Sequence, residues 1–416
     1  MREREDASRD AGERVEIEST SATSGWKIMR GMSARELRLA HTMPTGQSFR
    51  WQSRPDGDYV GVIGRRVVRV REDGGGGDAR YRVYCRPRGE TDADDEREIL
   101  GYFNAGVSLS EMYAEFGGRD ERFRSLATHV DGARMLRQDP SECLFSFICS
   151  SNNHISRIHG MVEKMCKRYG DALPVTAADV ARDDEEDTKT EASALVERAE
   201  EESKAAFYAF PSASRLASEA TEEELRALGF GYRAKFIVGT AKALTDAARE
   251  LGDGASPESY LRALREDTNY VDAHAALQKL PGIGPKVSSC VCLFSLDKHA
   301  AIPVDTHVWR LACEHYAPEL REAKTVTPKI MRAVELRFEE IFGAYAGWAH
   351  NALFIAELRS VRERLPESLR TPRTPKSKQS SGAAKRERPT PEPPADASLE
   401  SYDDEDAFAS PKRSPV

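Results

Sequence analysis

The chain has 416 residues, which is enough for two or three domains with a substantial core. Hydrophobic residues make up 39% of it and charged residues 31%, and no apolar run approaches the roughly 20 residues that a membrane helix needs. We therefore expect a soluble protein without a membrane partner. The first twenty residues contain acidic groups and no apolar stretch, which argues against a secretory signal and against a mitochondrial transit peptide.

The net charge of −8 looks unsuited to a nucleic-acid partner, but the excess of acidic groups is local. Residues 1–25 carry a net charge of −3, residues 183–202 carry −8, and residues 366–416 are neutral. The rest of the chain is therefore mildly basic, at +3, and its composition is compatible with a polyanionic partner.

The seven cysteines show no CxxC pair and no spacing typical of a zinc site or an iron–sulfur cluster. We expect these thiols to be reduced, in an intracellular compartment. The sequence accordingly predicts neither a metal nor another cofactor.

The N-terminal part of the chain has the pattern of a β-sheet. Residues 1–25 are polar and charged and are predicted to be disordered. From Trp26 to about Pro87 apolar and polar residues alternate, which predicts strands at 59–64, 65–71 and 80–84, with a hairpin loop at Gly74–Gly77. We expect an antiparallel sheet with one solvated face, in a β-rich domain over 26–130.

Helical periodicity begins at about Asp94, and the apolar run Pro140–Cys149, which opens with a helix-initiating proline, predicts a buried central helix. The fold class is therefore α+β, with a mostly helical domain over 131–365. An acidic insertion at 183–202 and a disordered tail at 366–416 complete the organisation. Further helices are predicted at 155–169, 221–227, 233–250, 270–280, 287–296, 308–315 and 327–342.

A short glycine-containing turn between two of these helices is the first candidate for a functional site. Gly282 and Gly284 supply unusual backbone dihedrals, and a turn of this kind exposes N–H groups at a helix start, which can bind phosphate. A tight helix–helix turn without a ligand explains the glycine spacing about equally well.

Lys286 follows this turn and Asp305 lies beyond the next helix, so the two suggest an amine nucleophile beside a charge stabiliser. For Lys286 to react its pKa must fall, and we expect burial against Cys290 and the helix dipole to lower it. Asp305 is also a natural cap for a helix starting near Thr306. His307 is either a phosphate contact or an ordinary partly buried histidine.

Five segments together resemble one protein family. The run from Leu280 to Arg310 resembles the helix-hairpin-helix and Gly/Pro-Asp motif of base-excision DNA glycosylases. Four more segments resemble the eukaryotic 8-oxoguanine DNA glycosylases, so the resemblance spans about residues 24–360 apart from the insertion. These segments are Pro44–Trp51, Leu136–Asn153, Gly231–Ala234 and Ala346–Phe354.

The resemblance implies roles for single residues. Lys286 matches the catalytic lysine and Asp305 the catalytic aspartate of the family. Gly46 matches the glycine whose carbonyl accepts a hydrogen bond from the protonated N7 of 8-oxoguanine, a position that in guanine is itself an acceptor. Cys290 and Phe354 match the residues that sandwich the flipped base.

The resemblance also implies a DNA interface. Asn152 matches the residue that fills the vacated space opposite the orphan cytosine, and Tyr232 matches the wedge that buckles the duplex. Arg157 and Arg233 match arginines that read this cytosine. His307 matches a histidine on the DNA backbone, while Gly282 and Gly284 form the DNA-binding hairpin. From residue type alone, most of these positions would be ordinary core, turn or solvated residues.

Two positions depart from the family pattern. His350 stands where the family has a glutamine that touches the Watson–Crick edge of the flipped base, and an imidazole has a different reach and titrates near pH 6.5. His154 likewise replaces an asparagine. Neither change touches the nucleophile, so the reaction class stands while the base selectivity is open.

The function implied is a monomeric DNA glycosylase with AP lyase activity, which acts on double-stranded DNA containing oxidised guanine and needs no cofactor. The resemblance implies a nuclear location and leaves a mitochondrial one open. A weak nuclear-localisation candidate lies at Lys385–Pro389.

Four alternatives remain. An endonuclease III-like or adenine-specific glycosylase usually carries an iron–sulfur cluster, whose cysteine spacing is absent here. A DNA-binding hairpin module without catalysis would need neither Lys286 nor Asp305. The third alternative is an inactive scaffold with an unreactive lysine, and the fourth is a glycosylase whose base specificity is shifted by His350.

Overall fold

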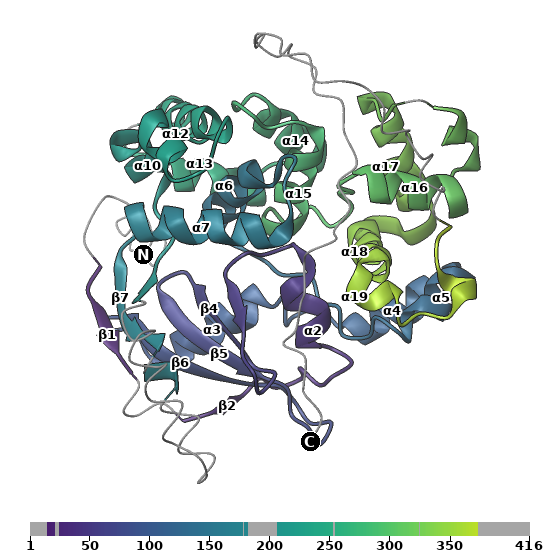
Figure 1. Cartoon of the computed structure of the whole chain (residues 1–416), viewed down its shortest axis with the longest axis horizontal. Coiled ribbons are helices and arrows are strands. Elements are labelled where there is room, and N and C mark those ends of the chain that lie inside the picture. The colour runs from purple at the N-terminus through teal and green to yellow at the C-terminus, as the bar shows by residue number, and fades with distance from the viewer. Residues whose placement is uncertain are drawn as a thin grey trace, which may run out of the picture.

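The computed structural model describes residues 15–20, 25–177, 179–181, 206–252, 254–323 and 325–372, and it has the α+β architecture that the sequence predicts. An antiparallel sheet forms one side of the molecule, and helices form the rest (Figure 1). The predicted insertion at 183–202, the localisation candidate at Lys385–Pro389 and the tail beyond Pro372 lie outside the described residues.

The main sheet has six antiparallel strands in the order β1-β6-β5-β4-β3, with β2 paired to β6. The three strands predicted from alternation form its centre, and the loop around Gly74–Gly77 joins β5 to β6 as predicted. The strands are β1 (Ile17–Ser19), β2 (Lys27–Ile28), β3 (Trp51–Ser53), β4 (Tyr59–Ile63), β5 (Arg66–Arg71) and β6 (Arg80–Pro87).

Both faces of this sheet are covered, so the prediction of one solvated face is wrong. On one face Val68, Val70 and Tyr81 pack with residues of helix α3 (Asp92–Tyr102). On the other, Val67 and Tyr84 pack with a small second sheet made of β7 (Ala172–Thr176) and β8 (Ala206–Tyr208). These two short strands flank the insertion, and neither has the alternation that predicts a strand from sequence.

Two segments within the termini that the sequence predicts to be disordered are ordered. Ile17–Ser19 form strand β1, which pairs with the edge of β6, although they are as polar as the residues around them. At the other end, residues 366–372 pack on the helical part of the molecule, and Thr371 is fully buried. Both segments gain order from tertiary hydrogen bonds, which local composition does not reveal.

The helical part matches the predicted helices to within about two residues at most ends. The helices that bear on the site are α6 (Pro140–Ser150), α7 (Ile155–Tyr169), α12 (Arg233–Glu250), α14 (Tyr270–Gln278), α15 (Pro285–Ser295), α16 (Thr306–His315), α17 (Pro328–Phe342) and α18 (Ala346–Glu357). The remaining ones are α2 (Leu39–Thr42), α4 (Leu109–Arg119), α5 (Glu121–Ala127), α10 (Ala213–Glu219), α11 (Glu222–Ala227), α13 (Pro257–Glu266) and α19 (Arg359–Arg362).

Helix α6 is the predicted central helix: residues 140–149 are all buried, and Asp139 caps its start by accepting a hydrogen bond from the Glu142 N–H. Helices α4 and α5 share a core with α17 and α18 through Phe116, Phe123 and Phe342. Residues 109–127 therefore pack with the C-terminal helices rather than with the sheet, although they precede the predicted boundary at 130.

The predicted hairpin joins α14 to α15 and depends on one glycine. Gly282 has φ of +78°, and a Cβ atom there would lie 2.4 Å from the Phe236 ring of α12. Gly284 has φ of −89° and caps α15, and a Cβ atom there would meet nothing within 4 Å. Gly282 is thus required by the fold itself, whereas Gly284 is not.

A buried arginine ties the sheet to the helices that carry the site. The Arg50 guanidinium, next to β3, lies 2.5 Å from the Cys166 sulfur of α7 and 3.9 Å from the Glu142 carboxylate of α6. It also donates to the Tyr208 carbonyl of β8. Burial raises the pKa of Glu142 to about 7, and the attraction of Arg50 offsets part of this rise.

This carboxyl makes stability depend on pH. Because the pKa of Glu142 is raised in the folded protein above its value of 4.5 in the unfolded chain, its contribution to stability is complete below about pH 4.5 and is lost as the pH rises through 7. We expect the unfolding free energy of the wild type to fall by about 2 kcal/mol relative to Glu142→Gln between pH 5 and pH 8. Urea unfolding at both pH values measures this, with the exposed Glu223→Gln as control. Parallel pH dependence in wild type and Glu142→Gln would contradict it.

The hairpin glycines give a second prediction. Gly282→Ala should lower the free energy of unfolding by about 2 kcal/mol or more, because the new Cβ atom meets the Phe236 ring at a positive φ. Gly284→Ala is the matched control, and its stability should stay within about 0.5 kcal/mol of the wild type. Chemical denaturation of the three proteins measures the difference. Equal losses of unfolding free energy in the two variants would contradict the conclusion that the fold requires a glycine at 282 but not at 284.

Candidate active site

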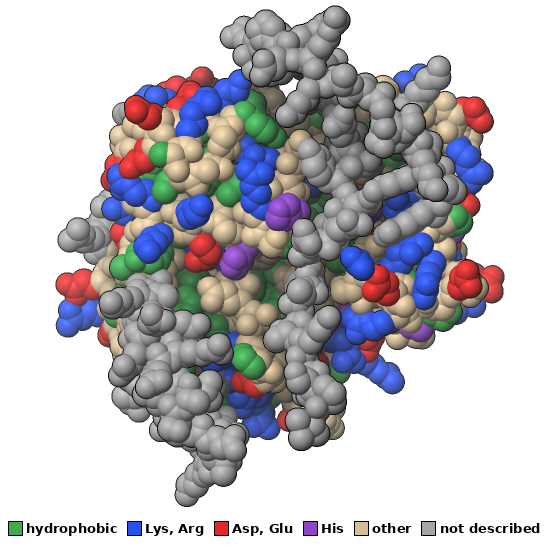
Figure 2. Space-filling model, viewed as in Figure 1, with side chains coloured by type: hydrophobic (Ala, Val, Ile, Leu, Met, Phe, Trp, Pro, Cys, Tyr) green, Lys and Arg blue, Asp and Glu red, His purple; other side chains and the backbone are tan. Residues whose placement is uncertain are grey.

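A cavity of about 660 Å³ is lined mainly by residues of α6, α7, α15, α16 and α18. It brings together most of the site residues predicted from the sequence. In Figure 2 a hollow with hydrophobic side chains lies beneath α7, and histidine and basic side chains gather beside it. Of the predicted site residues only Gly282 and Gly284 lie outside the cavity lining. The lining includes Gly46, Asn152, Arg157, Tyr232, Arg233, Lys286, Cys290, Asp305, His307, His350 and Phe354.

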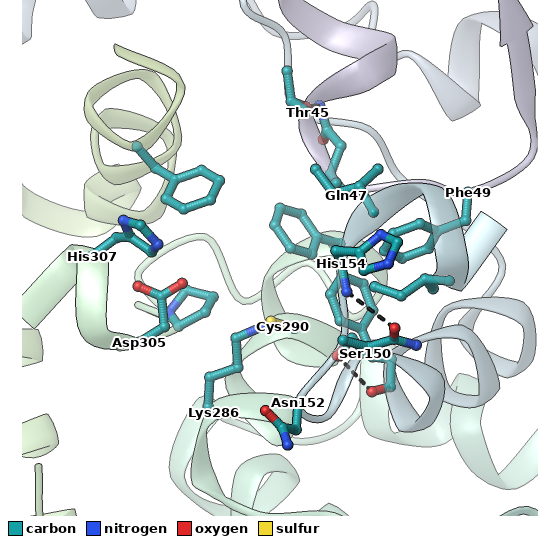
Figure 3. A pocket seen from close by; sticks show the side chains of 18 of the residues that line it. Thr45, Gln47, Phe49, Ser150, Asn152, His154, Lys286, Cys290, Asp305 and His307 are labelled. Atoms are coloured by element: carbon teal, nitrogen blue, oxygen red, sulfur yellow. Dashed lines mark hydrogen bonds between the residues drawn. The ribbon is translucent and has the colours of Figure 1, made fainter. Parts of the chain in front are cut away.

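Lys286 is the second residue of α15, directly after the hairpin, and Cys290 follows it one turn along the helix. Its ammonium group reaches into the cavity beside the Cys290 sulfur (Figure 3) and lies 5.6 Å above the centre of the Phe147 ring. Cys290 is 2% exposed. The lysine therefore stands at the floor of the cavity, on a helix whose start the hairpin holds.

The predicted fall in the pKa of Lys286 is wrong for the free protein. Burial does lower this pKa, but the Cys290 sulfur, which accepts a hydrogen bond from the ammonium group, and the attraction of the Asp305 carboxylate outweigh burial, and the pKa lies above its usual value. Burial also raises the pKa of the Cys290 thiol, against the opposing effect of Lys286. At neutral pH the pair is therefore an ammonium beside a thiol.

Asp305 faces this lysine from the opposite wall of the cavity (Figure 3). One carboxylate oxygen accepts a hydrogen bond of 2.8 Å from the Val308 N–H, so Asp305 caps α16 as the sequence predicts. The cap fixes the carboxylate and leaves it near enough to Lys286 to raise the pKa of the lysine. An amine and a carboxylate thus face each other across the cavity.

His350 and Phe354, one turn apart on α18, close the far end of the cavity. Their rings are stacked, with centroids 6.2 Å apart and planes inclined by 22°. His350 is 4% exposed, and neither of its ring nitrogens has a hydrogen-bond partner. Burial lowers the pKa of His350 to about 4, so the ring is neutral at physiological pH and offers one donor and one acceptor.

The rim of the cavity is formed by the loop between α6 and α7 and by the start of α12. Asn152 is exposed at the tip of the loop, with φ of +50°. Arg233 is buried, with its guanidinium 4.6 Å from the centre of the Tyr232 ring, and it donates a 2.9 Å hydrogen bond to the Asn152 carbonyl. Tyr232 is 44% exposed and Arg157 is exposed beside them. In this structure Arg233 braces the loop that presents Asn152.

Gly46 reaches the cavity from the sheet side, where it ends a short 3-10 turn with φ of +84°. A Cβ atom there would lie 3.2 Å from the Ile155 side chain of α7. The neighbouring Gln47 is 1% exposed and holds this turn by donating to the Thr42 and Arg134 carbonyls. The backbone of Gly46 is thus fixed against the helical part of the molecule.

Sequence reasoning missed two residues of the site. Phe147 lies beneath the Lys286 ammonium group, and the apolar run of α6 marks it only as core. Asn351 is 4% exposed, lines the cavity, and its side-chain N–H₂ group has no partner. A polar residue beside His350 within the apolar run of α18 was the available signal. In the described part of the chain no cluster of side chains suits a metal ion, and no helix is long and apolar enough to cross a membrane.

Comparison with known proteins matches two sequence families. The family described as the N-terminal domain of 8-oxoguanine DNA glycosylase matches residues 30–144, and the HhH-GPD superfamily of base excision DNA repair proteins matches residues 145–336. The chain is 43% identical over 338 residues to the N-glycosylase/DNA lyase OGG1 of Arabidopsis thaliana, covering 81% of this chain and 82% of that one. It is 33% identical to the N-glycosylase/DNA lyase of Saccharomyces cerevisiae, covering 78% and 84%.

A solved structure has the same fold. The 8-oxoguanine glycosylase/lyase of Clostridium acetobutylicum, crystallised with double-stranded DNA containing cytosine opposite 8-oxoguanine, superposes with a TM-score of 0.62. The two chains are 26% identical, and the match covers 85% of this chain and 98% of that one. Together with the family matches, this shows that the chain belongs to the 8-oxoguanine DNA glycosylases of the HhH-GPD superfamily.

Proposed function

We propose that this protein is a DNA N-glycosylase with AP lyase activity that removes 8-oxoguanine, and related oxidised purines, opposite cytosine. One observation carries the proposal: the Lys286 amine and the Asp305 carboxylate face each other across a cavity that stacked His350 and Phe354 close. The named activities of the Arabidopsis and yeast relatives and the DNA bound to the Clostridium enzyme support it.

The reaction begins when the damaged nucleotide is flipped out of the duplex into this cavity. The free amine of Lys286 attacks the anomeric carbon of the sugar, and the glycosidic bond breaks as the base leaves with its electron pair and takes up a proton. Asp305 stabilises the positive charge that develops on the sugar. The resulting secondary amine opens the sugar ring to a Schiff base, and proton loss beside the imine expels the 3′ phosphate by β-elimination.

The ammonium state of Lys286 in the free protein sets a condition on this mechanism. The lysine must lose a proton before it attacks, and its raised pKa makes that loss unfavourable until a substrate occupies the cavity. A base stacked between Cys290 and Phe354 would exclude water from the ammonium group, and this further loss of solvation lowers the pKa of the amine. The chemical step is thereby confined to the loaded site.

The remaining residues would hold the DNA. We assign the hairpin of Gly282 and Gly284, together with His307, to the backbone phosphates, and Asn152, Arg157, Tyr232 and Arg233 to the gap and the orphan cytosine. In the free structure Tyr232 and Asn152 are exposed, as an inserting wedge and filler need to be. Gly46 would offer its carbonyl to the N7 proton of 8-oxoguanine.

The organisation and setting that we propose follow from the same family. The sheet and its covering elements form an N-terminal domain, the helices around α6 and α15 form the glycosylase domain, and the enzyme acts as a monomer in the nucleus. Size-exclusion chromatography with and without a DNA duplex distinguishes the monomer from a dimer.

Covalent trapping tests the nucleophile. A duplex with 8-oxoguanine opposite cytosine, incubated with the protein and borohydride, should give a reduced enzyme–DNA adduct, because borohydride reduces the Schiff base. Lys286→Gln should give no adduct while still binding the duplex. Gly284→Ala, whose fold should be intact, should bind the same duplex more weakly if the hairpin meets phosphate. An adduct with Lys286→Gln, or none with the wild type, would refute the mechanism.

His350 decides between strict 8-oxoguanine specificity and a shifted one. A glutamine amide also offers a donor and an acceptor, so we expect His350→Gln to excise 8-oxoguanine as fast as the wild type or faster. Since the pKa of His350 is about 4, the two proteins should have parallel pH profiles between pH 6 and pH 9. Single-turnover excision measures both. A loss of more than about a hundredfold, or roughly 2.7 kcal/mol, would show that the site is rebuilt around histidine.

A further inference from the structure

The segment after α19 contains a buried threonine that is bound from several sides. Thr371 is fully buried, and its hydroxyl donates to the Glu357 carboxylate at the end of α18. The same oxygen lies 3.2 Å from the Arg122 guanidinium of α5 and 3.3 Å from the His315 ring of α16. The Thr371 carbonyl accepts a further hydrogen bond of 2.7 Å from Arg362. Thr371 therefore contacts four helices, α5, α16, α18 and α19, and two of them, α16 and α18, carry site residues.

Glu357 connects this anchor to α16. Its carboxylate is buried, and the oxygen that does not bind Thr371 lies 3.7 Å from the Arg310 guanidinium and 3.8 Å from that of Arg362. The hydroxyl has one proton, which it donates to the Glu357 carboxylate, so its oxygen accepts from Arg122 and the His315 ring nitrogen beside it acts as a donor. The threonine thus holds the Glu357 carboxylate in an orientation that keeps its second oxygen within ion-pair distance of Arg310.

Arg310 in turn contacts a residue of the cavity. Its guanidinium lies 3.3 Å from Nδ1 of His307, three residues earlier on α16. Arginine has no acceptor, so Nδ1 of His307 must accept, and the ring proton then sits on Nε2. His307 stands beside Asp305 on the same wall of the cavity, as Figure 3 shows.

We propose that Thr371 is a positioning residue for DNA binding, which acts through Glu357 and Arg310 to fix the orientation and the Nε2 proton of His307. The proposal rests on the proposed function, in which His307 meets a backbone phosphate. An imidazole with its proton on Nε2 is a directed donor to a phosphate oxygen, whereas the other tautomer would present a lone pair to the anion. Residues 366–372, which contain Thr371, therefore contribute to DNA binding.

Removal of the hydroxyl tests this. Thr371→Val keeps the shape of the side chain and removes the donor, and it should weaken binding of a duplex with a stable abasic-site analogue by about three- to tenfold. Thr371→Ser keeps the donor and should restore binding to within about twofold. Single-turnover excision at saturating enzyme should stay within about twofold of the wild type. Thr128→Val, which removes an exposed hydroxyl at the C-terminal cap of α5, is the control.

A double-mutant cycle with His307 separates positioning from a general loss of stability. In a His307→Gln background Thr371→Val should have no further effect on the dissociation constant, because both changes remove one contact. Additive effects, or binding by Thr371→Val that equals the wild type while His307→Gln binds more weakly, would overturn the proposal. If His307→Gln itself binds as the wild type does, the phosphate contact fails as well, whereas borohydride trapping at Lys286 still tests the enzyme activity separately.

Discussion

The site depends on stabilising the positive charge of the Lys286 ammonium group in a buried position. An ammonium group that leaves water costs several kcal/mol unless it is compensated, and here Cys290, Asp305 and the Phe147 ring provide the compensation. Each partner comes from a different constraint: Cys290 from the helical repeat of α15, Asp305 from the cap of α16, and Phe147 from the core of α6. The position of the Lys286 amine is thus a consequence of how three helices pack.

The sheet contributes to this arrangement although it carries no catalytic group. Arg50 joins β3 to α6, α7 and β8 through buried polar contacts, and Gln47 holds the turn that presents Gly46. Packing between the turn and Ile155 then sets the distance from Gly46 to the helical wall. Two groups of elements that are separate in sequence therefore form one cavity, whose width is held by contacts outside it.

Much of this could be predicted from the sequence where the signal is local. Helix periodicity gave α7 and α12 with correct bounds, and alternation gave β4 to β6. The failures share a cause, because β1, the β7–β8 pair and the segment up to Thr371 are ordered by partners far away in the chain. The expectation of a lowered pKa for Lys286 fails for the same reason. Burial of the amine could be expected from the sequence, but the groups around it, which raise its pKa, are placed by tertiary geometry.

The polar atoms left unpaired in the cavity indicate where selectivity arises. His350 and Asn351 present buried polar atoms to the cavity that make no hydrogen bond within the protein. A base whose edge matches these atoms would pair with them, and a base that lacks one matching group would leave a buried polar atom unpaired in the complex, which costs about 1–3 kcal/mol. Stacking on Phe354 is available to every base, so it supplies affinity without much choice. Under the proposed function, discrimination among bases would therefore fall to α18 and to the Gly46 carbonyl, while Lys286 would carry out the same chemistry on whichever base they admit.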